Sequence, residues 1–129
     1  MNFDQTSQSE VNNSQSVNLT NENFVQEVIE KSKSIPVIVD FWAPWCEPCK
    51  QIAPILDKLV ASSNGRVVLT KMNIDEHPEI SQQLQIQSIP AILGFHNGQP
   101  VDGFVGVQPE SAIKAFVEKL ADLNGPSDN

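Results

Sequence analysis

Cys46 and Cys49 are the only cysteines of the chain, and two residues separate them. Two sulfurs at this spacing can carry out thiol–disulfide exchange, in which one thiolate attacks a target disulfide and the other resolves the mixed disulfide. A purely structural bridge explains the pair poorly, because a disulfide that closes so short a loop adds little stability. The two cysteines therefore indicate redox chemistry or metal binding.

Zinc binding is the alternative for such a pair, because Cys-x-x-Cys can supply half of a structural zinc site. Such a site requires four ligands, and the remaining candidates are His77 and His96. Neither histidine has ligand spacing to the cysteines or to the other histidine. The polar run from Asp75 to His77 is interpreted as a solvated loop, so we expect no metal and no cofactor.

A strand and a helix are expected on either side of the cysteines. Residues 37–42 form a largely β-branched apolar run, which is typical of a buried strand. From Cys49 onward, apolar residues recur at helical spacing as far as Val60. Cys46 should then lie at the helix N-terminus, where unpaired amides and the helix dipole favour an anion and thus the reactive thiolate. Asp40 interrupts the strand, and a buried acid is costly unless it is paired or used.

The other elements complete an alternating pattern. Strands and helices that alternate imply parallel strands with helices on both faces, and the hairpin signal Asn97-Gly98 adds one antiparallel edge. The fold class is therefore α/β, with a central mixed five-stranded sheet flanked by four helices. Besides strand 37–42 and the helix after the cysteines, we expect strands at 17–19, 66–74, 91–95 and 101–107, and helices at 20–34, at 78–84 and from Pro109 onward.

Composition sets the domain organisation and narrows the class of partner. A chain of 129 residues allows one domain, which we place at residues 17–124 between a disordered tail at 1–16 and a frayed end at 125–129. The net charge of −8 argues against nucleic acid or an anionic membrane as partner. No apolar run approaches the ~20 residues of a membrane span, and the first residues lack a secretory signal. We therefore expect a cytoplasmic protein.

Four segments at matching order and spacing make the chain similar to the thioredoxin family over about residues 17–122. The resemblance implies the thioredoxin fold. The segments are Asp-Phe-Trp-Ala-Pro-Trp-Cys-Glu-Pro-Cys-Lys at 40–50, Lys-Met-Asn-Ile-Asp at 71–75, Ser-Ile-Pro-Ala at 88–91, and Asn97-Gly98 together with Val105-Gly106.

The resemblance implies catalytic roles for four residues. Cys46 corresponds to the nucleophile and Cys49 to the resolving thiol. Asp40 corresponds to the buried acid that accepts the proton of the second cysteine, and Lys71 to the lysine that partners this acid.

The resemblance also implies a binding site for the substrate. Pro90 corresponds to the cis-proline that faces the disulfide, which would leave the backbone of Ile89 free to pair with an extended substrate. The apolar collar that would receive the partner around Cys46 consists of Trp45, Ile74, Ile89, Val105 and Gly106.

Two residues depart from the family's usual pattern. Glu47 stands where the family usually has glycine, and Ala91 stands where it usually has threonine. Pro48 should stiffen the bend between the cysteines, whereas the Glu47 carboxylate should modestly disfavour the Cys46 thiolate. Residues 88–91 and 98–104 are more similar to the chaperedoxins, a bacterial subgroup that joins a thioredoxin domain to tetratricopeptide repeats.

Two functional hypotheses follow from the resemblance. The first is a thiol–disulfide oxidoreductase that reduces protein disulfides through a Cys46/Cys49 dithiol–disulfide cycle and is recharged by a flavin-dependent thioredoxin reductase. The second is the redox-capable, client-binding domain of a chaperedoxin, truncated before its repeats. An isomerase or oxidant is disfavoured, because it would need a periplasmic or luminal address.

Overall fold

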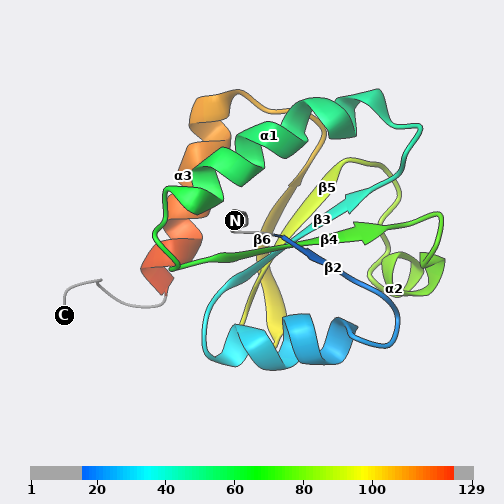
Figure 1. Cartoon of the computed structure of the whole chain (residues 1–129), viewed down its shortest axis with the longest axis horizontal. Helices are drawn as coiled ribbons and strands as arrows, with labels where there is room; N and C mark the ends of the chain where they lie inside the picture. The colour runs from blue at the N-terminus through cyan, green and yellow to red at the C-terminus, as the bar shows by residue number, and fades with distance from the viewer. Residues whose placement is uncertain (1–15, 124–129) are drawn as a thin grey trace, which may run out of the picture.

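The computed structural model describes residues 16–123. The predicted frayed end, and all but Ser16 of the predicted tail, therefore fall outside the described residues. Within the described range the chain forms a mixed five-stranded sheet with helices on both faces, as predicted (Figure 1). The strands are β2 (Val17–Asn18), β3 (Val37–Trp42), β4 (Val68–Asn73), β5 (Ala91–His96) and β6 (Gln99–Val105).

The strand order is β2-β4-β3-β5-β6, and strand direction changes within the sheet. β2, β4 and β3 are parallel, whereas β5 runs antiparallel to β3 and β6 runs antiparallel to β5. The expectation that only the closing hairpin would be antiparallel was wrong. The helix between β4 and β5, α2 (Pro78–Gln83), has six residues and spans about 9 Å. That is less than the ~20 Å of a six-residue strand, so the chain enters β5 at the end of the sheet where β4 finished.

Alternation along β3 separates two apolar cores. Ile38 belongs to the core beneath α1 (Glu47–Ala61) and α3 (Glu110–Leu123), which lie together on one face of the sheet (Figure 1). Val37, Val39 and Phe41 point to the opposite core, because successive side chains of a strand alternate between faces. Asp40 follows the parity of Ile38 and therefore lies on the α1 face. Phe24, Phe41, Phe95 and Phe116 are buried, as expected for core residues.

The first helix is less regular than its sequence pattern predicts. Thr20 Oγ1 accepts a hydrogen bond from the backbone N–H of Asn23 at 3.0 Å, and Asn23 Oδ1 accepts one from the N–H of Thr20 at 2.8 Å. This reciprocal bonding fixes the turn that leads into the helix, whose N-cap is Phe24. The chain then forms a π-helix at Val25–Glu30 and a 3₁₀ turn at Lys31–Lys33. The buried Ser32 ties this end of the segment to the hairpin, since its Oγ accepts from the N–H of Gly98 at 2.8 Å.

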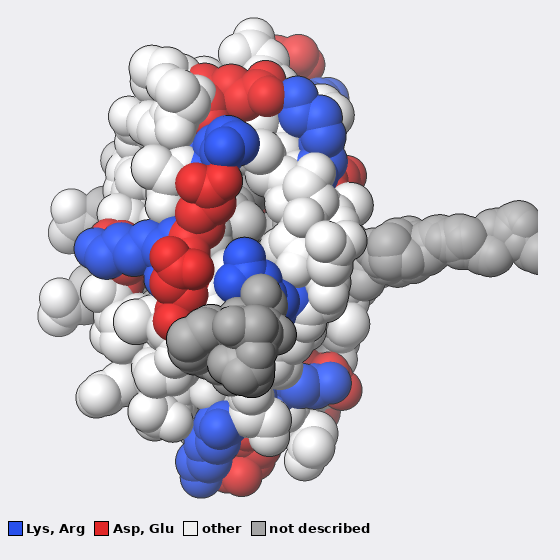
Figure 2. All heavy atoms as spheres, turned by 90° about the vertical axis from the view of Figure 1, so that its left-hand side faces the viewer, with Lys and Arg blue, Asp and Glu red and all other residues white. Residues whose placement is uncertain are grey.

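Charged side chains are interspersed on the outer surface. Figure 2 shows acidic side chains in a stripe with basic side chains on both sides of it. Ion pairs connect α3 to other elements, including Lys58 with Glu110 and Arg66 with Asp122. Such exposed pairs contribute about 0–1 kcal/mol each and mainly compensate charge locally.

Candidate active site

Cys46 and Cys49 form a disulfide at the point where β3 leads into α1. Their Cα atoms are 5.3 Å apart, and both residues are buried. Cys46 is the N-cap of α1, and its sulfur accepts a hydrogen bond from the N–H of Cys49 at 3.2 Å. The sequence-based expectation that Cys46 lies at the helix N-terminus is thus met by the geometry, and the amides there would stabilise a thiolate.

Glu47 and Pro48 occupy the first turn of α1. Pro48 is favourably placed, since the first turn of a helix has no intrahelical partner for its N–H. The Glu47 side chain is 77% exposed, and its carboxylate lies 3.3 Å from the Lys50 ammonium. The carboxylate next to Cys46 is therefore largely solvated and partly compensated.

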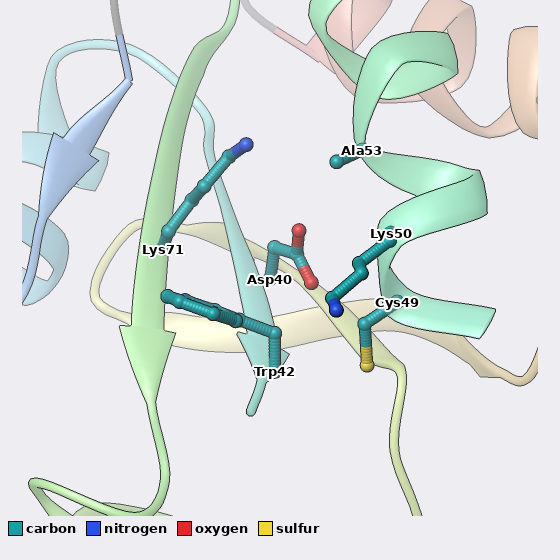
Figure 3. A pocket seen from close by; sticks show the side chains of 6 residues that line it. All are labelled: Asp40, Trp42, Cys49, Lys50, Ala53 and Lys71. Atoms are coloured by element: carbon teal, nitrogen blue, oxygen red, sulfur yellow. The ribbon is translucent and has the colours of Figure 1, made fainter. Parts of the chain in front are cut away.

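Asp40 is buried behind the disulfide, with 1% of its surface exposed. Its Oδ1 atom has no hydrogen-bond partner among the described residues. Burial raises the pKa of Asp40 to about 7, an effect that Lys71 partly opposes and Asp57 reinforces. The acid opens into a pocket of about 170 Å³ that reaches Cys49 (Figure 3). The pocket is lined by Asp40, Trp42, Cys49, Lys50, Ala53 and Lys71.

Lys71 is adjacent to Asp40 but makes its ion pair elsewhere. The two residues are opposite one another in the parallel register of β3 and β4. The Lys71 ammonium, however, lies 3.6 Å from Oδ1 of Asp57, on α1. The expected partnership of Lys71 with Asp40 is therefore a charge interaction across the pocket, and the direct ionic partner is Asp57, which the sequence analysis did not identify. Its position eight residues after Cys49 on the same helix was the available signal.

The peptide bond between Ile89 and Pro90 is cis, and Pro90 precedes β5 directly. The Pro90 carbonyl accepts a hydrogen bond from the N–H of Gly106 at 2.8 Å. This bond joins the start of β5 to the end of β6. Ile74 and Ile89 pack against the two cysteines. Two of the five predicted collar residues thus lie against the disulfide.

Trp45 and Val105 are the exposed members of that collar, at 66% and 55%. The Trp45 Nε1–H donates to the Asp75 carboxylate at 3.1 Å, and Asp75 lies exposed in a turn, as expected for a solvated loop residue. A second pocket, of about 320 Å³, lies beside the disulfide. It is lined by Trp45, Ile74, Ile86, Gln87, Ser88 and Ile89.

A family model described as Thioredoxin matches residues 15–119. The chain belongs to the thioredoxin family. Curated relatives agree with this assignment over most of their own length. Thioredoxin 1 of Nostoc sp. (strain PCC 7120) is 41% identical over 101 residues, which are 78% of this chain and 92% of the relative. Thioredoxin 1 of Synechococcus elongatus is 43% identical over 78% of this chain and 92% of the relative. Thioredoxin of Rickettsia felis is 42% identical over 79% of this chain and 95% of the relative.

As a thioredoxin with a Cys46–Cys49 disulfide, the chain is a thiol–disulfide oxidoreductase that reduces protein disulfides. This agrees with the first hypothesis from the sequence, and the relatives do not favour the chaperedoxin alternative. Among residues 16–123, the structure shows no group of three or more His, Cys, Asp or Glu side chains that could hold a metal ion. None of the helices in this range is long and apolar enough to span a membrane.

Proposed function

We propose that Cys46 attacks the client disulfide, that Cys49 resolves the mixed disulfide, and that Asp40 accepts the proton of Cys49. The observation that carries this assignment is the asymmetry of the site around two almost equally buried cysteines. Cys46 caps α1, whereas Cys49 lines the pocket that contains the buried acid. One sulfur is therefore placed to be a thiolate, and the other is placed to lose a proton when needed.

In the first step, the Cys46 thiolate forms a bond to one client sulfur and breaks the client disulfide. The other client sulfur leaves as a thiolate and takes up a proton. In the second step, Cys49 gives its proton to Asp40, and its thiolate attacks Cys46 Sγ. This step forms the Cys46–Cys49 disulfide and releases the second client sulfur as a thiolate, which then takes up a proton, so the client gains the two electrons that the dithiol loses.

Asp40 suits the role of proton acceptor because of its environment. A pKa of about 7 allows the carboxylate to take up a proton near neutral pH and to release it afterwards. Its buried Oδ1 has no hydrogen-bond partner among the described residues, so this oxygen can still accept a proton or a hydrogen bond. Lys71 lies at the same pocket and keeps part of the acid ionised through its positive charge.

The client is proposed to bind as an extended segment across the face formed by Trp45, the cis-proline and the β5–β6 end. The resemblance to the family assigns the backbone of Ile89, which directly precedes Pro90, to pairing with such a segment. The side pocket beside Ile74 and Ile89 would take an apolar client side chain. Val105 and Gly106 would close the opposite side of the client segment.

Recharging is proposed to depend on a flavin-dependent thioredoxin reductase, which would return two electrons to the disulfide. The chain itself would need no cofactor. We place this cycle in the cytoplasm and assign it to residues 17–124 as one domain. These assignments follow the resemblance of the four sequence segments and extend beyond the family membership itself.

Reduction of insulin disulfides with NADPH and a thioredoxin reductase tests this function. We expect multiple turnovers for the wild-type chain and no turnover above background for Cys46→Ser. Activity that requires a chemical reductant such as dithiothreitol would contradict the proposed reductase coupling and favour the client-binding alternative. Full activity of Cys46→Ser would contradict the assignment of the attacking sulfur.

A further inference from the structure

The pocket behind Cys49 contains one acid and two lysines, and neither lysine is ion-paired to that acid. Asp40 Oδ1 is unpartnered, although Lys50 and Lys71 line the same pocket. Lys50 pairs with Glu47 at 3.3 Å, and Lys71 pairs with Asp57 at 3.6 Å. Each ammonium is thus held by a carboxylate that lies outside the pocket lining.

The Lys71–Asp57 pair is the one that bears directly on the acid. Lys71 is opposite Asp40 in the β3–β4 register, and only 18% of its side chain is exposed. A long lysine side chain so close to a buried carboxylate could lean onto it. Figure 3 shows instead that the Lys71 amino group points away from the Asp40 carboxyl, in the direction of Ala53.

Helical spacing explains why Asp57 can hold that amino group. Cys49, Ala53 and Asp57 follow one another at intervals of four residues on α1 and therefore share a face of the helix. Cys49 and Ala53 line the pocket, and Asp57 stands one turn beyond them. The Ala53 side chain on α1 faces the Lys71 amino group from the opposite side of the pocket (Figure 3).

We propose that Asp57 is a positioning residue: it holds the Lys71 ammonium at the outer end of the pocket and thereby leaves Asp40 without an ion-pair partner and free to exchange a proton with Cys49. This inference rests on the proposed role of Asp40. Asp57 would act on the acid chiefly through Lys71, and it would touch neither the client nor the sulfurs.

The two charged groups nearest Asp40 act on its pKa in opposite directions. Asp57 raises the pKa of Asp40 and Lys71 lowers it, after the larger effect of burial. Lys50 and Cys49 of α1 complete the titratable and charged groups that line the pocket. On the other side of β3, the β5 residue opposite Asp40 is the apolar Ile92. If the Asp57 charge is removed, the repulsion disappears and Lys71 is released toward Asp40, and both changes favour the ionised acid.

Carbon-13 NMR titration of the Asp40 carboxyl in the disulfide-bonded protein tests the proposal without interference from thiols. Asp57→Asn should lower the Asp40 midpoint by about 0.5 to 1 pH unit, a threefold to tenfold loss of proton affinity. Asp122→Asn is the matched control, because Asp122 is exposed and pairs with Arg66 at the same 3.6 Å. This control should leave the midpoint unchanged.

Two further variants separate positioning from simple repulsion. Asp57→Glu should keep the Asp40 midpoint close to its wild-type value, since its carboxylate can still reach Lys71. In a Lys71→Gln background, Asp57→Asn should lower the midpoint by less than half as much. An unchanged or raised midpoint in Asp57→Asn, or an equal shift in the Lys71→Gln background, would overturn the proposal.

Kinetics of mixed-disulfide release distinguish this inference from the proposed function on which it rests. If Asp40 is the proton acceptor, the pH profile of release should move in Asp57→Asn by the same amount as the NMR midpoint. A shifted midpoint with an unmoved profile would support the positioning of Lys71 by Asp57 and contradict the catalytic role of Asp40.

Discussion

Glu47 lies directly after Cys46, the proposed attacking residue, at the position where the family usually has glycine. Two effects of its carboxylate oppose one another at this site. A negative charge in the first turn stabilises the helix by about 0.3–1 kcal/mol, but it also disfavours a thiolate one residue away. The structure limits both effects, because the side chain is 77% exposed and pairs with Lys50.

Glu47→Gln should therefore increase the fraction of Cys46 present as thiolate near neutral pH, by about twofold or less in low salt. The physical reason is the loss of a like charge beside the sulfur, without the added backbone freedom of glycine. Thiolate absorbance at 240 nm, titrated in low and high salt, measures the effect. A thiolate fraction that is unchanged or smaller in low salt would show that the helix terminus alone sets the reactivity.

At the scale of elements, the β5–β6 hairpin carries one side of the client site. Ala91 pairs with Val105 at the end of the hairpin nearest the disulfide, so the collar depends on the register of these two strands. Gly103 is opposite Leu93 in the same ladder. A Cβ atom at Gly103 would lie 2.8 Å from the carbonyl oxygen of Ile92, which belongs to backbone that cannot easily move aside.

Gly103→Ala should thus destabilise the fold by about 1–3 kcal/mol, because the added methyl overpacks the hairpin. Val101→Ala, at an exposed position of the same strand, is the control and should cost about 0.5 kcal/mol or less. Urea unfolding of both variants gives the comparison. Equal midpoints for Gly103→Ala and the wild type would mean that the hairpin yields locally and that its register is not tightly fixed.

At the scale of the whole molecule, the buried acid Asp40 lowers the stability of the fold near neutral pH. The folded state raises the pKa of Asp40 from 3.8 to about 7, so between these values the folded protein binds a proton that the unfolded chain has released. The contribution of Asp40 to the free energy of unfolding is fully present below about pH 4 and is lost as the pH rises through about 7. The cause is the desolvation of the carboxylate under α1.

Asp40→Asn should remove this loss. We expect the variant to equal the wild type near pH 4 and to be more stable at pH 8, by about 4 kcal/mol at most. Urea unfolding of the disulfide-bonded proteins from pH 4 to 8 provides the measurement, since all other carboxylates titrate in both proteins. A stability difference that does not change with pH would show that Asp40 titrates normally.

The sequence was sufficient to predict the elements that carry strong local signals. The β-branched run of β3, the helical spacing after Cys49 and the Asn97-Gly98 turn each appear where they were expected. Strand direction was harder, because the antiparallel placement of β5 depends on how far α2 can carry the chain. The distance spanned between β4 and β5 is a property of the whole connecting segment, and no local residue pattern predicts it.

The site was predictable where residues are close in sequence and less so where they meet through packing. Cys46, Cys49 and Asp40 lie within one strand-to-helix segment. The periodicity of this segment predicted Cys46 at the helix start, and the resemblance to the family predicted Asp40 behind the disulfide. The contacts that Asp57 and Asp75 make at the site were not predicted, because each contact is made with a side chain from another part of the chain. Lys71 of β4 forms an ion pair with Asp57 of α1, and Trp45 donates a hydrogen bond to Asp75.

Trapping of the mixed disulfide is the measurement that tests the central claim most directly. Cys46→Ser and Cys49→Ser are each mixed with an insulin client, and covalent adducts are identified by mass spectrometry. The account predicts that Cys49→Ser accumulates client joined through Cys46 and that Cys46→Ser accumulates almost none, because only Cys46 attacks and only Cys49 releases. Equal or greater trapping by Cys46→Ser would contradict it.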